Sequence, residues 1–160
     1  MELRRTQLFW LVALRVFIGW HFLYEGLVKL VNPNWSSLGY LLDSDGPLRE
    51  LFVWMASAPS LLQVIDFLNV WGLILVGLGL MAGLLERAAL AGGIVLLAFY
   101  YLSHPPFIGL NYGLPSEGSY LVVNKTLIEL IAMIVLFVFP TAKRIGLDRL
   151  IFHNKRRKHG

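Results

Sequence analysis

The sequence predicts an all-α integral membrane protein whose four transmembrane helices form a bundle. Of its 160 residues 57% are hydrophobic and only 15% are charged, whereas about a quarter of the residues in a soluble domain are charged. Four long apolar runs alternate with polar connections, and lysine and arginine gather near the ends of these runs. Lipid, and not a polar shell, must therefore cover much of the surface.

The apolar runs fall at 8–30, 61–85, 88–102 and 120–139, and the third is the shortest. About 20 residues are enough for a helix to cross the hydrocarbon core of a bilayer. The first run is too long for the core of a signal peptide and has no small-residue cleavage site, so we expect a retained helix. We predict one transmembrane domain over residues 1–152, followed by a basic cytoplasmic tail at 153–160.

Basic residues predict the orientation, because positively charged connections favour the cytoplasm. They precede the first run, join the second run to the third, and follow the fourth; they are Arg4, Arg5, Arg87, Lys143, Arg144 and Arg149. Both termini should therefore lie in the cytoplasm, with the protein in the inner membrane of a cell. The net charge of +4 suits anionic lipid headgroups better than nucleic acid, and we expect no nucleic-acid partner.

Two connections should lie on the outer side of the membrane. The first, 31–60, mixes tryptophan, tyrosine and phenylalanine with leucines and few charges. Such a composition favours short helices at the headgroup boundary, with a turn at 43–47 between them. The second, 103–119, contains the sequences His104-Pro105-Pro106 and Asn111-Tyr112-Gly113, which predict a loop with restricted backbone freedom that could act as a lid.

The first run carries four polar side chains that are costly in lipid: Arg15, His21, Glu25 and Lys29. A charge at the centre of a spanning helix costs about 2.5–3.5 kcal/mol. At 100° per residue the four share an arc of about 120°, so they form one polar face that should point into the bundle. Arg15 should lie in the inner half, and Lys29 near the outer boundary.

Other runs should bring polar groups to the same outer level. We expect proton-transfer roles for Glu25, Asp66, Glu129 and His104, and binding roles for Arg15, His21, Lys29, Asn69 and Lys125. The alternative is that the acids pair with the lysines and Arg15 only to fix helix register, with the lysines reaching the membrane surface. The histidine spacings match neither a metal site nor a pair of haem ligands, and we expect no metal or haem.

The first run can be written Arg15-xxx-Gly19-xx-Phe22-xxx-Gly26-xx-Lys29, which resembles the first-helix signature of the DoxX family of small four-helix membrane proteins. The glycine-rich second run ending near Arg87 and the sequence Gly146-Leu147-Asp148-Arg149 also resemble that family. The resemblance implies a group that includes the membrane subunit of thiosulfate:quinone oxidoreductase, and members that serve as membrane partners of other redox proteins.

Three functions remain open from the sequence. In the first, a quinone headgroup enters from lipid, is held by Lys29, Lys125 and His104, and receives protons through the acids. The chain has no cysteine, so electrons would come from a small reductant or a redox partner protein. In the second, the protein is a membrane anchor with 32–59 as its docking surface. In the third, it is a small proton-coupled transporter built as a homo-oligomer.

Overall fold

The computed structural model describes residues 4–114 and 121–150. In these residues it contains six helices and no strand: α1 (Arg5–Val31), α2 (Leu38–Leu42), α3 (Arg49–Ser57), α4 (Pro59–Ala82), α5 (Glu86–Ser103) and α6 (Lys125–Val138). Three of them, α1, α4 and α5, are long and apolar enough to span a membrane. This confirms an all-helical membrane protein with these three candidate spans.

The fourth predicted run, 120–139, becomes a shorter helix than its length suggests. Helix α6 has 14 residues, fewer than the roughly 20 that a straight spanning helix needs. It begins at Lys125 because the side chain of Asn124 accepts a hydrogen bond from the backbone N–H of Leu127 at 2.9 Å, an N-cap. The apolar residues 121–123 precede this cap outside the helix, and residue 120 lies outside the described residues.

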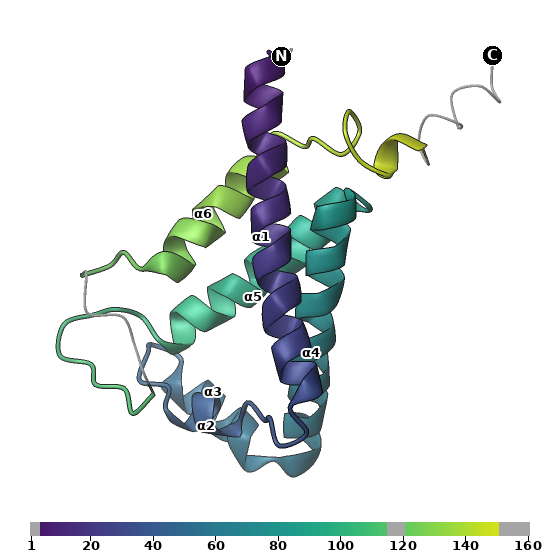
Figure 1. The fold of residues 1–160 in the computed structure, drawn as a ribbon. Helices are drawn as coiled ribbons and strands as arrows, with labels where there is room; N and C mark the ends of the chain where they lie inside the picture. The colour runs from purple at the N-terminus through teal and green to yellow at the C-terminus, as the bar shows by residue number, and fades with distance from the viewer. Residues whose placement is uncertain (1–3, 115–120, 151–160) are drawn as a thin grey trace.

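Helices α1 and α4 pack side by side along much of their length (Figure 1). Glycines allow this close approach: a Cβ atom on Gly26 would lie 2.9 Å from the backbone nitrogen of Ile74. A Cβ atom on Gly77 would lie 2.5 Å from the backbone nitrogen of Leu23. Small residues serve the same purpose in membrane helix pairs generally. Helix α5 packs against α4 on one side and α6 on the other.

The apolar core takes side chains from α1, α4, α5 and α6. Its fully buried members are Leu80, Leu90, Met133 and Leu136. Many large apolar side chains point outward instead, and Phe17 is 73% exposed. Apolar surface of this extent on long apolar helices is that of a protein embedded in lipid.

The start of α1, the turn between α4 and α5, and the end of α6 lie at one end of the molecule, which we call the turn end (Figure 1). Asp148 fixes this end by accepting hydrogen bonds from the backbone N–H groups of Leu85 at 2.8 Å and Glu86 at 3.1 Å. Gly83 and Leu85 both have positive φ angles, 62° and 49°. The Asp148 bonds hold the unusual leucine conformation in place.

The opposite end, which we call the loop end, carries α2, α3 and the loop that follows α5 (Figure 1). The two short helices fall in the connection where the sequence predicts them, separated by residues 43–48. Leu41, Phe52 and Ala56 are buried in a small second core against α4. Leu51 and Trp54 point outward and are exposed.

Candidate functional site

Arg15 is buried at the turn end, away from the other predicted site residues. Its Nη1 donates to the hydroxyl of Thr141 at 2.8 Å and its Nη2 donates to the carbonyl of Ile145 at 2.9 Å. Nη1 also lies 3.5 Å from Oε1 of Glu86, and each of the two side chains is 2% exposed. The expected binding role of Arg15 stays a prediction, and its side chain lies at the end of the molecule opposite the loop end.

Glu86 accepts three further hydrogen bonds, which makes it the centre of a buried hydrogen-bond network. The backbone N–H and hydroxyl of Thr141 donate to Oε1 at 3.0 and 2.9 Å, and the backbone N–H of Ala142 donates to Oε2 at 2.8 Å. The network connects α1, the start of α5 and the segment after α6. It compensates the burial of both charges, which is the register-fixing role that the sequence left open for Arg15.

At the loop end, His21 of α1 contacts Glu129 of α6. The two atoms His21 Nδ1 and Glu129 Oε1 are 2.8 Å apart. The imidazole is the more exposed partner, with 57% of its side chain accessible against 15% for the carboxylate. A histidine and a carboxylate in contact form a group that can hold and pass a proton.

Lys29 is the start of a hydrogen-bonded chain that crosses from α1 to α5. Its ammonium donates to Asn69 Oδ1 at 3.1 Å, and the Asn69 amide donates to the phenol oxygen of Tyr100 at 2.7 Å. The ammonium also lies 5.1 Å from the ring centroid of Trp35 and 5.6 Å from that of Tyr100. Amide and aromatic groups together thus stabilise the Lys29 charge.

Asp66 is used to hold the start of α2. It accepts hydrogen bonds from the hydroxyl of Ser36 at 2.9 Å and from the backbone N–H of Ser37 at 2.8 Å, and a third from the Ser37 hydroxyl. Three donors therefore occupy this carboxylate, and it does not line the cavity described below.

His104 lies between two tyrosine rings just beyond the end of α5. Its ring centroid is 4.0 Å from that of Tyr40 and 4.6 Å from that of Tyr112. Its Nε2 lies 3.4 Å from Oδ2 of Asp43, which also accepts the backbone N–H groups of Gly113 at 2.7 Å and of residue 114 at 3.0 Å. Asp43 therefore fastens the loop after α5 to the end of α2.

The charges in this stack respond to their surroundings. Burial lowers the pKa of His104, against the opposing effect of the nearby Asp43 carboxylate. Partial desolvation acts to raise the pKa of Asp43, but the hydrogen bonds from two backbone N–H groups and from His104 outweigh it and lower that pKa. Burial raises the pKa of Tyr40. Near neutral pH the arrangement therefore favours a neutral imidazole beside an ionised carboxylate.

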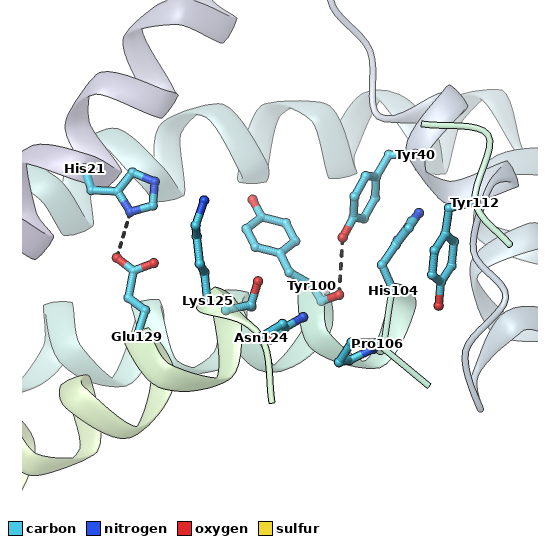
Figure 2. A pocket seen from close by; sticks show the side chains of 10 residues that line it. His21, Tyr40, Tyr100, His104, Pro106, Tyr112, Asn124, Lys125 and Glu129 are labelled. Atoms are coloured by element: carbon cyan, nitrogen blue, oxygen red, sulfur yellow. Dashed lines mark hydrogen bonds and ion pairs between the residues drawn. The ribbon is translucent and has the colours of Figure 1, made fainter. Parts of the chain in front are cut away.

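Between these groups lies a cavity of about 310 Å³, and neighbouring cavities of about 160 and 250 Å³ share lining residues with it. Figure 2 shows the side chains that line the largest of them. Thr126 and Tyr100 line all three, and we call the three together the polar hollow. Seven predicted site residues line it: His21, Glu25, Lys29, Asn69, His104, Lys125 and Glu129.

Sequence reasoning missed several residues of the hollow, namely Tyr40, Tyr100, Tyr112, Asn124 and Thr126. The signal that could have found Tyr100 is its place at the outer end of an apolar run, where a phenol needs a polar partner. Within residues 4–114 and 121–150 no group of histidine, aspartate and glutamate side chains could hold a metal ion.

The family model of DoxX matches residues 10–105, more than half of the chain. The chain belongs to the DoxX family. No curated protein and no solved structure gives a significant match. The DoxX match runs from α1 through α5 to the residue after His104, so it includes Lys29 and Tyr100. Lys125 and Glu129, which close the hollow from α6, lie beyond it.

In this DoxX chain the hollow combines three kinds of polar group. Lys29 and Lys125 are cations, Tyr100 is a phenol, and the His21–Glu129 pair can exchange a proton. Together these groups can orient a planar ligand that has hydrogen-bond acceptors.

Proposed function

We propose that this DoxX chain is a membrane subunit associated with redox chemistry that binds a quinone headgroup in the polar hollow. The single observation that carries the proposal is that Lys29, Tyr100 and the His21–Glu129 pair all line the 160 Å³ cavity. Family membership supports a membrane role. The quinone, the redox role and the enzyme class are our inference from the chemistry of the hollow.

Lys29 and Tyr100 are the proposed ligands of a quinone carbonyl oxygen. An ammonium group has three donors, and Asn69 accepts one of those of Lys29. The face of Trp35 beside the ammonium offers a surface on which a planar ring can stack. Lys125, from the start of α6, lines the same hollow and would favour the partly negative oxygens of a bound quinone.

The His21–Glu129 pair is the proposed proton source. Reduction of a quinone to a quinol consumes two electrons and two protons, so protons must reach both ring oxygens. His21 and Glu129 line both the 310 Å³ and the 160 Å³ cavities, and Glu25 lines the smaller one. The electrons would be delivered by a small reductant or by a partner redox protein.

The proposed placement in the membrane is a four-helix bundle with the turn end in the cytoplasm of the cell. Arg4 precedes α1, Arg87 lies in the first turn of α5 and Lys143 follows α6, so these basic residues adjoin the elements of the turn end, and the positive-inside rule favours the cytoplasm for them. The apolar residues 121–123, which precede α6 outside the helix, lengthen its apolar segment toward that of a span, and they are exposed like Ile131 on the helix. Helices α2 and α3 would then lie at the outer headgroup layer.

The anchoring role is the competing proposal. The exposed Leu51 and Trp54 of α3 would contact either a protein partner or lipid headgroups. A transporter built as a homo-oligomer is the third candidate, with a permeating solute in the hollow. The occupant of the hollow decides between them: a quinone, nothing, or a solute.

The test is the quinone content of the protein purified in mild detergent, measured by solvent extraction and chromatography. Lys29→Met and Glu129→Gln should each lose bound quinone, about tenfold for Lys29→Met because a hydrogen bond to a charged group contributes about 1.5–3 kcal/mol. Lys143→Met is the matched control, since Lys143 is exposed near the turn end. A stably folded wild type that neither contains quinone nor binds it when supplied would favour the anchoring role.

A further inference from the structure

A second cavity of about 270 Å³ lies beside the polar hollow, among α2, α3, α4 and α5. Leu41 and Phe52, both buried, belong to its lining. Leu68, Val95 and Phe99 also line it but are exposed. The cavity therefore has an apolar interior and an opening toward the lipid that surrounds the helices.

This apolar pocket shares lining residues with the polar hollow. Tyr40, Asn69 and Tyr100 line both the apolar pocket and the 250 Å³ part of the hollow. A ligand with a polar ring and a flexible apolar chain would place its two parts on the two sides of Tyr100. We propose that the apolar pocket holds the first prenyl units of the tail of the quinone whose headgroup occupies the hollow; this rests on the proposed function.

The polar groups in the pocket wall do not offer a site for a charged lipid headgroup. The Ser37 hydroxyl donates to Asp66, the Tyr40 hydroxyl donates to the backbone carbonyl of Tyr100, and the Asn69 amide donates to the Tyr100 phenol. Among the described residues that line the pocket there is no lysine, arginine or histidine. A neutral chain fits such a wall better than the end of a phospholipid that carries a phosphate.

The shape of the wall suits a branched chain. Met55, a flexible side chain that adapts to irregular neighbours, lies in the lining together with Ile65 and Phe99. Because the surrounding solvent is lipid, the gain on binding comes from packing between the tail and this wall and not from removal of water. Contacts between the tail and this wall should therefore raise the affinity of the protein for the quinone by a moderate factor.

The experiment fills the pocket and compares two ligands that share one headgroup. Val95→Trp places a large ring at the pocket, and Val64→Trp is the matched control: Val64 does not line the pocket, and the two valines are 52% (Val64) and 54% (Val95) exposed. Radiolabelled quinone with a prenyl tail and its tail-free analogue are titrated against full-length protein in the same detergent. Partition into micelles is equal for all variants, so a change between variants reports the pocket.

We expect Val95→Trp to weaken binding of the tailed quinone about fivefold and to leave the tail-free analogue within about twofold of wild type. Val64→Trp should behave as wild type. If Val95→Trp does not fold, Ile65→Phe, which enlarges another side chain of the lining, takes its place with the same expectation.

Two results would overturn the tail assignment while leaving the headgroup site in place. One is an unchanged affinity of the pocket-filled variants for the tailed quinone, with the tail-free analogue still bound. The other is displacement of the tailed quinone by phosphatidylcholine as effectively as by unlabelled tailed quinone, which would make the pocket an acyl-chain site. If neither quinone binds the folded wild type, both the proposed function and this inference fail.

Discussion

Nη1 of Arg15 lies 3.5 Å from Oε1 of Glu86, and the hydroxyl of Thr141 bridges the two groups, accepting from the guanidinium at 2.8 Å and donating to the carboxylate at 2.9 Å. An ionised arginine well inside the first helix is tolerated because Glu86 lies beside its charge and both of its Nη atoms donate hydrogen bonds. The network also connects segments that are far apart in the sequence, so it sets how α1, α5 and the segment after α6 fit together.

Glu86→Gln should destabilise the protein by about 3 kcal/mol, because removing one partner of a buried pair leaves the other charge uncompensated. The new amide NH₂ would also face a backbone N–H donor at residue 141 or 142. Denaturant unfolding in detergent measures the change. Glu50→Gln, at an exposed position on α3, is the control, and equal stability of the two variants would contradict the role of the network.

Gly26→Ala should separate α1 from α4 at the loop-end half of their contact. The added methyl would lie 2.7 Å from Cγ1 of Ile74 and 2.9 Å from its backbone nitrogen, which costs about 1–3 kcal/mol of stability. Gly39→Ala is the control, since no atom of residues 4–114 or 121–150 lies within 4 Å of a methyl there, apart from those of the helix itself and the chain neighbours. Thermal unfolding should distinguish the two variants, and a neutral Gly26→Ala would argue against the close helix pair.

The fastening of the loop after α5 should weaken in acid. Burial lowers the pKa of His104 from 6.5, so an opened loop takes up a proton at a higher pH than the closed one. The contribution of His104 to the stability of the closed loop is therefore fully present above about pH 6.5. It is lost as the pH falls toward the lowered pKa of His104 in the closed loop. The groups in contact with the ring include Tyr40, Asp43, Tyr112 and the hydroxyl of Ser103, which lies 3.0 Å from Nδ1. The Asp45 carboxylate acts on Tyr112.

Hydrogen exchange at the backbone amides of Gly113 and Leu114, which donate to Asp43, measures this opening. After correction for the intrinsic rate, protection should fall between about pH 7.5 and about pH 5.5. His104→Gln should remove most of that pH dependence. A wild-type protection factor that does not change with pH would contradict the predicted weakening of the loop in acid.

Single cysteines test the orientation without interference, because the chain has no cysteine of its own. A membrane-impermeant thiol reagent should label Gly39→Cys, which lies at an open site on α2, from outside the cell. Arg87→Cys, at the exposed start of α5, should react only after the membrane is opened. The reverse pattern would invert the proposed topology.

Most of the helical framework can be predicted from the sequence, because apolar length alone marks α1, α4 and α5. The polar pairing cannot. The polar face of α1 predicts that Arg15 points into the bundle, but its partners are Glu86 at the start of α5 and Thr141 in the segment after α6, and neither is among the acids expected to pair with it. Helix periodicity orders residues around one axis but does not say which residue of another segment arrives opposite them.

The aromatic part of the site is hidden for a similar reason. Tyr100 lies in an apolar run and Tyr40 in a connection whose aromatic residues also suit a headgroup layer, so neither stands out in the sequence. Their importance comes from tertiary placement, since Tyr100 lines the polar hollow and the apolar pocket at once. By contrast, charged residues in an apolar run stand out, and the sequence identifies Lys29 and Glu129 as candidates on that ground.

The central claim, a quinone headgroup in the polar hollow, is tested most directly by photolabelling the purified protein with an azido-quinone and mapping the labelled peptides. We predict saturable labelling within residues 21–29 of α1, at the end of α5 near Tyr100, and at the start of α6 near Thr126, competed away by unlabelled quinone. Labelling that does not saturate, or that falls evenly over lipid-facing residues such as Phe17 and Leu75, would contradict the claim.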